Sequence, residues 1–116
     1  MAEPYLQNLR DILDRLAPIA GVRHELTCKH FFAGAAAYTE GRIFMTLTPV
    51  GLAVKLPPAR RDALLAAGGK PLRYFSKAPV KKAYVLLPEE TIGDDQVLAG
   101  LIAESVRFSL SALKRA

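Results

Sequence analysis

The sequence predicts an α+β fold of two layers, in which helices cover a largely antiparallel sheet of about five to six strands. Three observations support this prediction. Residues 4–20 and 97–110 show the apolar period of amphipathic helices. Residues 31–56 instead show runs of aromatic and aliphatic residues separated by tight-turn sequences. The steps between strands are short, which favours antiparallel pairing, so the helices must cover a face of the sheet.

The first predicted helix spans residues 4–20. Its apolar residues recur at spacings of three and four, which places them on one face: Leu6, Leu9, Leu13, Leu16 and Ala20. Pro4 suits the first turn, and Gly21 is a typical C-terminal cap. Pro18 allows a second interpretation, in which the helix ends a turn earlier, near Ala17.

Four strands are predicted next, over residues 23–32, 35–39, 42–48 and 52–56. In the first strand, alternation places four side chains on one face: Leu26, Cys28, His30 and Phe32. Ala33-Gly34 indicates a bend or a bulge, because glycine tolerates backbone angles that other residues resist. Glu40-Gly41 and Pro49-Val50-Gly51 are turn sequences that join the later strands as hairpins.

The second half of the chain predicts a helix, two strands and a last helix, so the element order is α-β4-α-β2-α. Pro58 opens a helix over residues 59–67 and Gly68-Gly69 ends it. Its inward residues are expected to be Ala63, Leu64 and Ala67. Strands follow over residues 72–76 and 83–87, and a turn begins at Pro88. Asp94 or Asp95 is a good N-cap for the last helix. The apolar stripe of that helix is Val97, Leu98, Leu101, Ile102, Ser105, Val106 and Leu110.

The length of 116 residues predicts one domain over residues 1–116. The single cysteine, Cys28, excludes an intramolecular disulfide and fits a reducing compartment. The first residues lack the basic and apolar regions of a signal peptide, and no apolar run approaches the roughly 18 residues of a membrane-spanning helix. We therefore expect a cytoplasmic protein with no membrane partner.

Basic residues are concentrated between positions 55 and 82, where eight of them face one acid, a local net charge of +7. These candidate contacts for an anion or a nucleic acid are Lys55, Arg60, Arg61, Lys70, Arg73, Lys77, Lys81 and Lys82. Tyr74 and Phe75 lie among them, and aromatic side chains on an exposed sheet can stack on bases. Two other interpretations stay open: an ordinary solvated surface for the cations, and burial of one aromatic ring, because strand residues alternate faces.

The candidate metal ligands of the chain are His24, Cys28 and His30. On an extended strand, His24 and Cys28 would stand roughly 13 Å apart, too far to ligate one zinc ion. Cys28 and His30 would point the same way but stand nearly 7 Å apart, roughly twice the reach of a nucleophile and its base. We therefore expect these residues to have a core or surface role and not to bind a metal.

Two further motifs have simpler structural explanations. Gly68-Gly69-Lys70 resembles the end of a phosphate-binding loop, but the glycines follow a predicted helix, which favours a helix C-cap. Glu89-Glu90 and Asp94-Asp95 are adjacent acids before a helix, the usual pattern of solvated caps. No catalytic, metal-binding or cofactor-binding residue is predicted, so the chain is not expected to be an enzyme.

Residues 27–90 carry a family resemblance. The matching residues are Phe32-Ala33-Gly34, Tyr38, Gly41-Arg42-Ile43-Phe44, Gly51-Leu52-Ala53-Val54-Lys55, Gly68 or Gly69, Pro71-Leu72-Arg73-Tyr74, and Tyr84 followed by Pro88. Through them the chain resembles the N-terminal domain of the TfoX/Sxy family, bacterial proteins linked to competence regulation. Ala33 replaces a glycine of the family pattern, Ala53 replaces a common aromatic, and the last helix lacks a frequent tryptophan. Residues 95–113 are equally similar to the YjbR family.

The resemblance implies an α+β fold like that of YjbR and the type III secretion chaperones. Full-length relatives act as transcriptional co-regulators, and the family brings no catalytic residues to this chain. We therefore expect a non-enzymatic regulatory or protein-interaction domain with a protein partner and no cofactor, and a homodimer is one form of that partnership. The alternative function is a nucleic-acid-binding accessory domain that uses the basic residues of positions 55–82.

Overall fold

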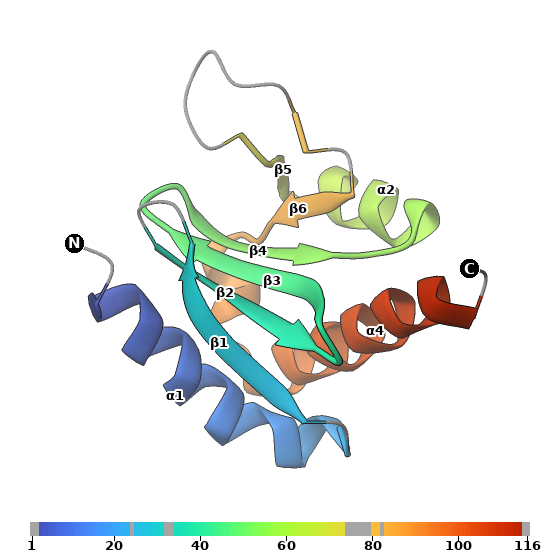
Figure 1. Cartoon of the computed structure of the whole chain (residues 1–116). Helices are drawn as coiled ribbons and strands as arrows, with labels where there is room; N and C mark the ends of the chain where they lie inside the picture. The colour runs from blue at the N-terminus through green and yellow to red at the C-terminus, as the bar shows by residue number, and fades with distance from the viewer. Residues whose placement is uncertain (1–2, 24, 32–33, 74–79, 82, 115–116) are drawn as a thin grey trace.

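The computed structural model describes residues 3–23, 25–31, 34–73, 80–81 and 83–114 (Figure 1). In chain order, the elements are α1 (Glu3–Ala20), β1 (Leu26–Phe31), β2 (Gly34–Thr39), β3 (Arg42–Thr48), β4 (Gly51–Lys55), α2 (Pro58–Ala66), β5 (Lys70–Pro71), β6 (Tyr84–Leu86), α3 (Glu89–Ile92) and α4 (Asp95–Lys114). The predicted α+β class is confirmed, with one more helix among the described residues than the sequence predicted.

The six strands form one sheet in the order β1-β2-β3-β4-β6-β5. Every pair of neighbouring strands is antiparallel, as predicted. The two edge strands are very different in length, because β1 has six residues and β5 has two. The sheet therefore has one long edge and one short edge.

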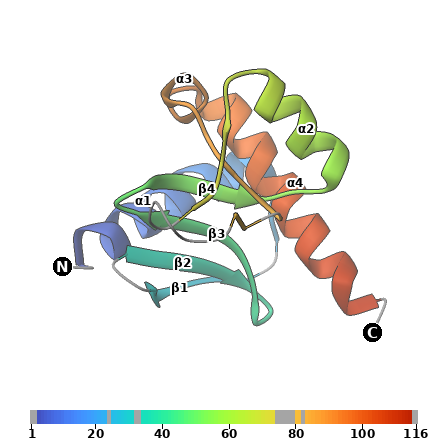
Figure 2. The ribbon, with the colours of Figure 1, turned by 90° about the horizontal axis from the view of Figure 1, so that it is seen from above.

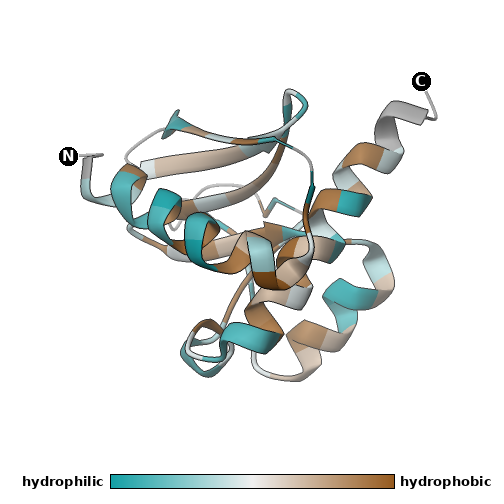
Figure 3. Ribbon diagram, turned by 90° about the horizontal axis from the view of Figure 1, so that it is seen from below, coloured by the Kyte–Doolittle hydropathy of each residue, from teal (hydrophilic) through white to brown (hydrophobic). Residues whose placement is uncertain are grey.

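Helices α1 and α4 pack against each other and against the same face of the sheet (Figures 1 and 2). α1 lies over β1, β2 and β3, whereas α4 lies over β2, β3 and β4. The wholly buried side chains of this core come from both layers and include Leu9, Leu16, Phe44, Met45, Val54, Leu98, Leu101 and Ile102. Hydrophilic and hydrophobic bands alternate along α1 (Figure 3), as expected for a helix with one face in the core.

The first helix confirms the longer of the two predictions. α1 continues through Pro18 to Ala20, so the interpretation that it ends near Ala17 is wrong. Pro18 lies in the last turn, where its missing N–H removes only one helical hydrogen bond. Gly21 then takes a positive φ of 70° and its N–H donates to the carbonyl of Pro18 at 3.3 Å. Of the predicted face, the four leucines are buried and Ala20 is half-buried.

The later helices correct three predictions. In α2 only Leu64 is buried, while Ala63 and Ala67 are exposed, because α2 packs mainly against β6 at one side of the sheet. A short helix, α3, forms where the sequence predicted a turn. Val97 was predicted in the core but is 44% exposed. It lies about 100° around the helix from the wholly buried Leu98, which moves it off the inward face.

The central strands were predicted best. β3 has the predicted bounds, β2 begins one residue earlier than predicted, and β4 begins and ends one residue earlier. At the predicted hairpin turn Glu40-Gly41, φ is 48° and 78°, the two positive values of the turn type that tight hairpins favour. β1 and β6 are shorter than predicted.

The strand predicted over residues 72–76 is wrong in the part that is described. β5 covers only Lys70 and Pro71, and Leu72 follows it outside any strand, with its side chain wholly buried. Pro71 has no N–H to donate to a strand ladder, which limits this segment to a short edge. Residues 74–76 lie outside the described residues.

The bend or bulge predicted at Ala33-Gly34 lies partly outside the described residues. Ala33 lies outside the described residues, and Gly34 pairs regularly as the first residue of β2. A separate irregularity lies further along β2. The register shifts between Ala37 and Tyr38, which pair with Met45 and Ile43 and leave Phe44 of β3 as an extra residue. Such a β-bulge leaves backbone groups unpaired in the ladder.

Two serines of α4 bind the backbone at this bulge. The hydroxyl of Ser105, which is wholly buried, donates to the carbonyl of Phe44 at 2.9 Å. Ser109 donates to the carbonyl of Ile43 at 3.5 Å. These bonds explain why polar residues lie on the inward face of α4, since a buried carbonyl needs a donor.

Replacing Ser105 with alanine is expected to lower the free energy of unfolding by about 2 kcal/mol, because the buried carbonyl of Phe44 loses its donor. Urea unfolding followed by circular dichroism measures the change. Ser111→Ala is the matched control, since Ser111 donates only to the carbonyl of Phe108 within its own helix. Equal stability of the two variants would contradict the role given to Ser105.

Candidate functional site

The basic residues predicted as contacts separate into different environments. Lys55 and Arg61 are half-buried, at the end of β4 and on α2. Arg60 of α2 donates from Nε to the carboxylate of Glu104 in α4 at 2.9 Å. This ion pair joins two helices, which is a structural use of one predicted cation. Lys77 and Lys82 lie outside the described residues.

The remaining three cations are exposed and lie near the short sheet edge. Lys70 belongs to β5, Arg73 follows it by three residues, and the N–H of Lys81 donates to the carbonyl of Leu72 at 2.9 Å. That bond holds Lys81 close to the chain between Lys70 and Arg73. The predicted aromatic partners Tyr74 and Phe75 are outside the described residues, so the candidate nucleic-acid contacts here are the three cations.

Of the motifs with metal or phosphate chemistry, the glycine motif is described in full and the metal motif in part. Among the described residues, no three His, Cys, Asp or Glu side chains lie close enough to hold a metal ion. His24 is not among those residues. Gly68 has a φ of 111°, and the N–H of Gly69 donates to the carbonyl of Leu64 at 2.8 Å. This geometry is a helix C-cap, as predicted, and not a phosphate-binding loop.

The paired carboxylates also act at helix ends. Asp94 Oδ1 accepts the N–H groups of Gln96 and Val97 at 3.1 and 3.2 Å, which confirms it as the N-cap of α4. Asp95 forms an exposed ion pair with Arg15 of α1 at 3.3 Å. Glu89 and Glu90 are exposed in the first turn of α3. These positions fit capping and solvation.

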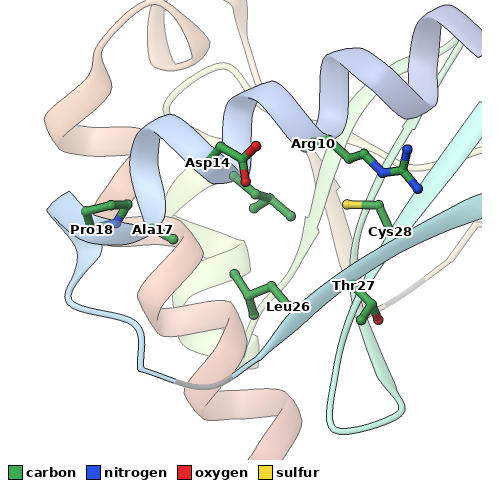
Figure 4. Close-up of a pocket in the computed structure, with 8 residues that line it drawn as sticks. Arg10, Asp14, Ala17, Pro18, Leu26, Thr27 and Cys28 are labelled. Atoms are coloured by element: carbon green, nitrogen blue, oxygen red, sulfur yellow. The ribbon is translucent and has the colours of Figure 1, made fainter.

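A groove of about 590 Å³ lies between α1 and the edge strand β1. One wall is formed by α1, with Arg10, Leu13, Asp14, Ala17 and Pro18. The other wall is formed by the strand side, with Leu26, Thr27 and Cys28. The helix residues recur at spacings of three and four, so they share one side of α1. Figure 4 shows Leu26 and Cys28 projecting toward α1, with Arg10 beside the Cys28 sulfur. The groove therefore has an apolar floor and charges of both signs on its helix wall.

Cys28 is the potentially reactive group of the groove, and its surroundings keep it protonated. Burial raises the pKa of the Cys28 thiol, Arg10 lowers that pKa in part, and Asp14 raises it further. A thiol with a raised pKa is a poor nucleophile near neutral pH. The groove is thus better suited to binding than to covalent catalysis.

Asp14→Asn is expected to speed alkylation of Cys28 by iodoacetamide, and Arg10→Gln to slow it, because the two charges shift the thiol pKa in opposite directions. The measurement is the pH dependence of the alkylation rate in the folded protein. The raised pKa also implies that stability falls as pH rises from the unfolded thiol pKa through the folded one. Cys28→Ala should lack that fall. Slower alkylation in Asp14→Asn, or faster alkylation in Arg10→Gln, would contradict the assignment.

The groove borders the long open edge of the sheet. β1 pairs with β2 on one side, and none of the other described strands lies on its outer side. The unpaired N–H and C=O groups of an edge strand can accept another strand. Side chains of an added strand would alternate between the groove beside α1 and the opposite face of the sheet.

Sequence reasoning missed this groove. It predicted α1 and the face shared by Leu26 and Cys28, but not that α1 covers the strand at the edge of the sheet. A partial signal was available in Arg10, Asp14 and Ala17, which repeat beside the leucine stripe at helical spacing. Only the strand order shows that β1 is an edge.

Comparison with known protein families identifies the family of this chain. A family model described as the TfoX N-terminal domain matches residues 14–109, most of the chain. A search of curated proteins found no match. In the part of the chain that the structure describes, none of the helices has the length and apolar character needed to cross a membrane.

Proposed function

We propose that this chain, which belongs to the TfoX N-terminal domain family, is a non-enzymatic protein-interaction domain of a regulatory system. At the level of the family, the match supports a regulatory domain of the competence type. The proposal includes a cytoplasmic location, which the free thiol of Cys28 favours, and binding without a cofactor.

The observation that carries this proposal is the open edge of β1 beside the α1 groove. An extended segment of a partner adds to β1 as a further strand, and main-chain hydrogen bonds supply much of the binding energy. Every second side chain of that segment enters the groove and meets Leu13, Ala17 and Leu26. Arg10 and Asp14 select among partners by charge.

Ala17→Arg is expected to abolish partner binding, because the new side chain fills the groove from the half-buried position of Ala17. The measurement compares the proteins captured by immobilised wild type and variant, identified by mass spectrometry. Asn8→Arg is the matched control, since it adds the same charge to an exposed position of α1 that does not line the groove. Unchanged capture by Ala17→Arg would contradict the proposed site.

The second candidate function is binding of nucleic acid by the cations near β5. The exposed positions of Lys70, Arg73 and Lys81 favour it, because clustered cations bind phosphates by releasing counterions. Arg60 is not expected to contribute, since Glu104 already pairs with it. This function would use the β5 edge of the sheet, which is opposite to the edge formed by β1.

Fluorescence anisotropy with a labelled oligonucleotide tests this candidate at about 50 mM salt and above. Changing Lys70, Arg73 and Lys81 together to alanine should weaken binding and reduce the salt dependence by about one phosphate contact per cation. Arg107→Ala, at an exposed position of α4, controls for loss of general charge. Absence of binding by the wild type at low salt would exclude this function.

A further inference from the structure

The two edges of the sheet are unequal in a way that bears on the partner of β1. β5 is short and contains Pro71, two features that natural sheets use to block an edge. β1 has six residues and contains no proline, and none of the other described strands lies on its outer side. A sheet with one open and one blocked edge can pair with the open edge of one further copy. The resulting dimer then has only blocked edges and cannot add a third copy.

The sequence of β1 fits such pairing with itself. An antiparallel pair about a two-fold axis through Cys28 sets Cys28 opposite Cys28 of the second copy. Thr27 then faces Lys29 of the other copy, and Leu26 faces His30. All of Leu26–His30 pairs in this register, and both copies keep their helices on the same face. An axis through Lys29 would instead bring two lysines into direct opposition, which is unfavourable.

The charges of α1 complement each other about the same axis. Arg10 and Asp14 both lie close enough to Cys28 to act on its thiol, and both are exposed on the wall of the groove. Neither forms an ion pair with another described residue. A two-fold axis through Cys28 brings Arg10 of each copy toward Asp14 of the other, which gives two equivalent pairs of opposite charges. The side chains of the other copy's β1 that point toward the helix layer then enter each groove.

We propose that the partner strand of β1 is β1 of a second copy, so that the chain forms a closed homodimer with one continuous sheet. The proposal rests on the proposed function, since it names the occupant of the same groove. Pairing about Cys28 satisfies the edge of both copies at once. The blocked β5 edges at the two ends prevent further growth into a filament.

Sedimentation equilibrium of charge-reversed variants tests the dimer. Arg10→Asp alone and Asp14→Arg alone should each raise the dimer dissociation constant about tenfold or more, because two cross-subunit attractions become repulsions. The double variant Arg10→Asp/Asp14→Arg should return it close to the wild-type value. A wild type that stays monomeric, or a double variant as weak as the single ones, would overturn the proposal.

Oxidation of Cys28 tests the register. Diamide accepts the two electrons and two protons that a pair of thiols releases when the disulfide forms. Residues directly opposite in an antiparallel pair have Cα atoms about 4.5–5.5 Å apart, within the range of a disulfide. Diamide should therefore convert the wild type to a covalent dimer. In a Cys28→Ala background, Thr27→Cys should crosslink far more slowly, because the two new thiols are offset diagonally.

Crosslinking of Thr27→Cys as fast as Cys28 would overturn the register through Cys28. The outcomes also separate this proposal from the function on which it rests. A monomeric wild type whose partner capture is still lost on Ala17→Arg would refute the homodimer and leave the groove as a site for a different protein. A monomeric wild type whose partner capture is unchanged by Ala17→Arg would refute the interaction site itself.

Discussion

Gly34→Ala is expected to lower the free energy of unfolding by about 3 kcal/mol or more, a large part of the stability of a small domain. A Cβ at this position would lie 2.2 Å from the carbonyl oxygen of Leu47 and 2.7 Å from the Cα of Thr48. Both are backbone atoms of β3, so no side-chain rotation relieves the clash. The end of β3 must therefore move away from β2, which disturbs the pairing of these two strands.

Gly100→Ala is the matched control for this substitution. Gly100 is exposed in α4, and a Cβ there would meet nothing within 4 Å. Alanine in an exposed helix position gains up to about 1 kcal/mol over glycine, so the control should be more stable than the wild type. Urea unfolding at fixed temperature measures both changes. Equal effects of the two variants would show that β2 and β3 do not approach as closely as described.

The requirement at Gly34 illustrates what the sequence could and could not predict about the fold. Turns such as Glu40-Gly41 depend on local backbone angles, so their residues are informative by themselves. Gly34 is needed because β3, which follows later in the chain, approaches its Cα closely. The sequence indicated only a bend or a bulge at Ala33-Gly34, which lies partly outside the described residues, and not the close approach of β3.

The same distinction explains the errors at the ends of elements. The 72–76 stretch has strand-forming residues, yet the ladder in the described part stops at Pro71, since a proline cannot donate to it. Val97 fits an apolar period, but the inward direction of α4 is set by Leu98, Leu101 and Ile102. Periodicity defines a helical face only to within about one residue, and packing against the sheet decides the rest.

The candidate site was less predictable than the fold, for a physical reason. Charge is visible in a sequence, so the cations of positions 55–82 drew attention first. The structure separates these cations, pairing Arg60 with Glu104 and exposing Lys70. A groove depends on which strand lies at the edge and which helix runs beside it. That is a property of topology, and no local pattern in β1 reports it.

Phe44→Ala is expected to cost about 4 kcal/mol of stability, the largest effect of a single truncation predicted for this chain. The Phe44 side chain is wholly buried in the core between the sheet and the two long helices. It also stands at the β-bulge, whose carbonyl is fixed by Ser105 of α4. Because that bond holds the backbone in place, the core cannot collapse easily into the space left by the ring, and the cavity remains.

Two comparisons make this prediction specific. Phe44→Leu keeps part of the volume and should cost about 1 to 2 kcal/mol. Val97→Ala removes an apolar side chain that the sequence placed in the core, but which is 44% exposed, so it should change stability by less than about 0.5 kcal/mol. The order Phe44→Ala, Phe44→Leu, Val97→Ala in urea unfolding is the expected result. A Val97→Ala loss comparable with that of Phe44→Ala would mean that α4 presents a different face to the sheet, and the positions given to Ser105 and Ser109 at the bulge would then be wrong.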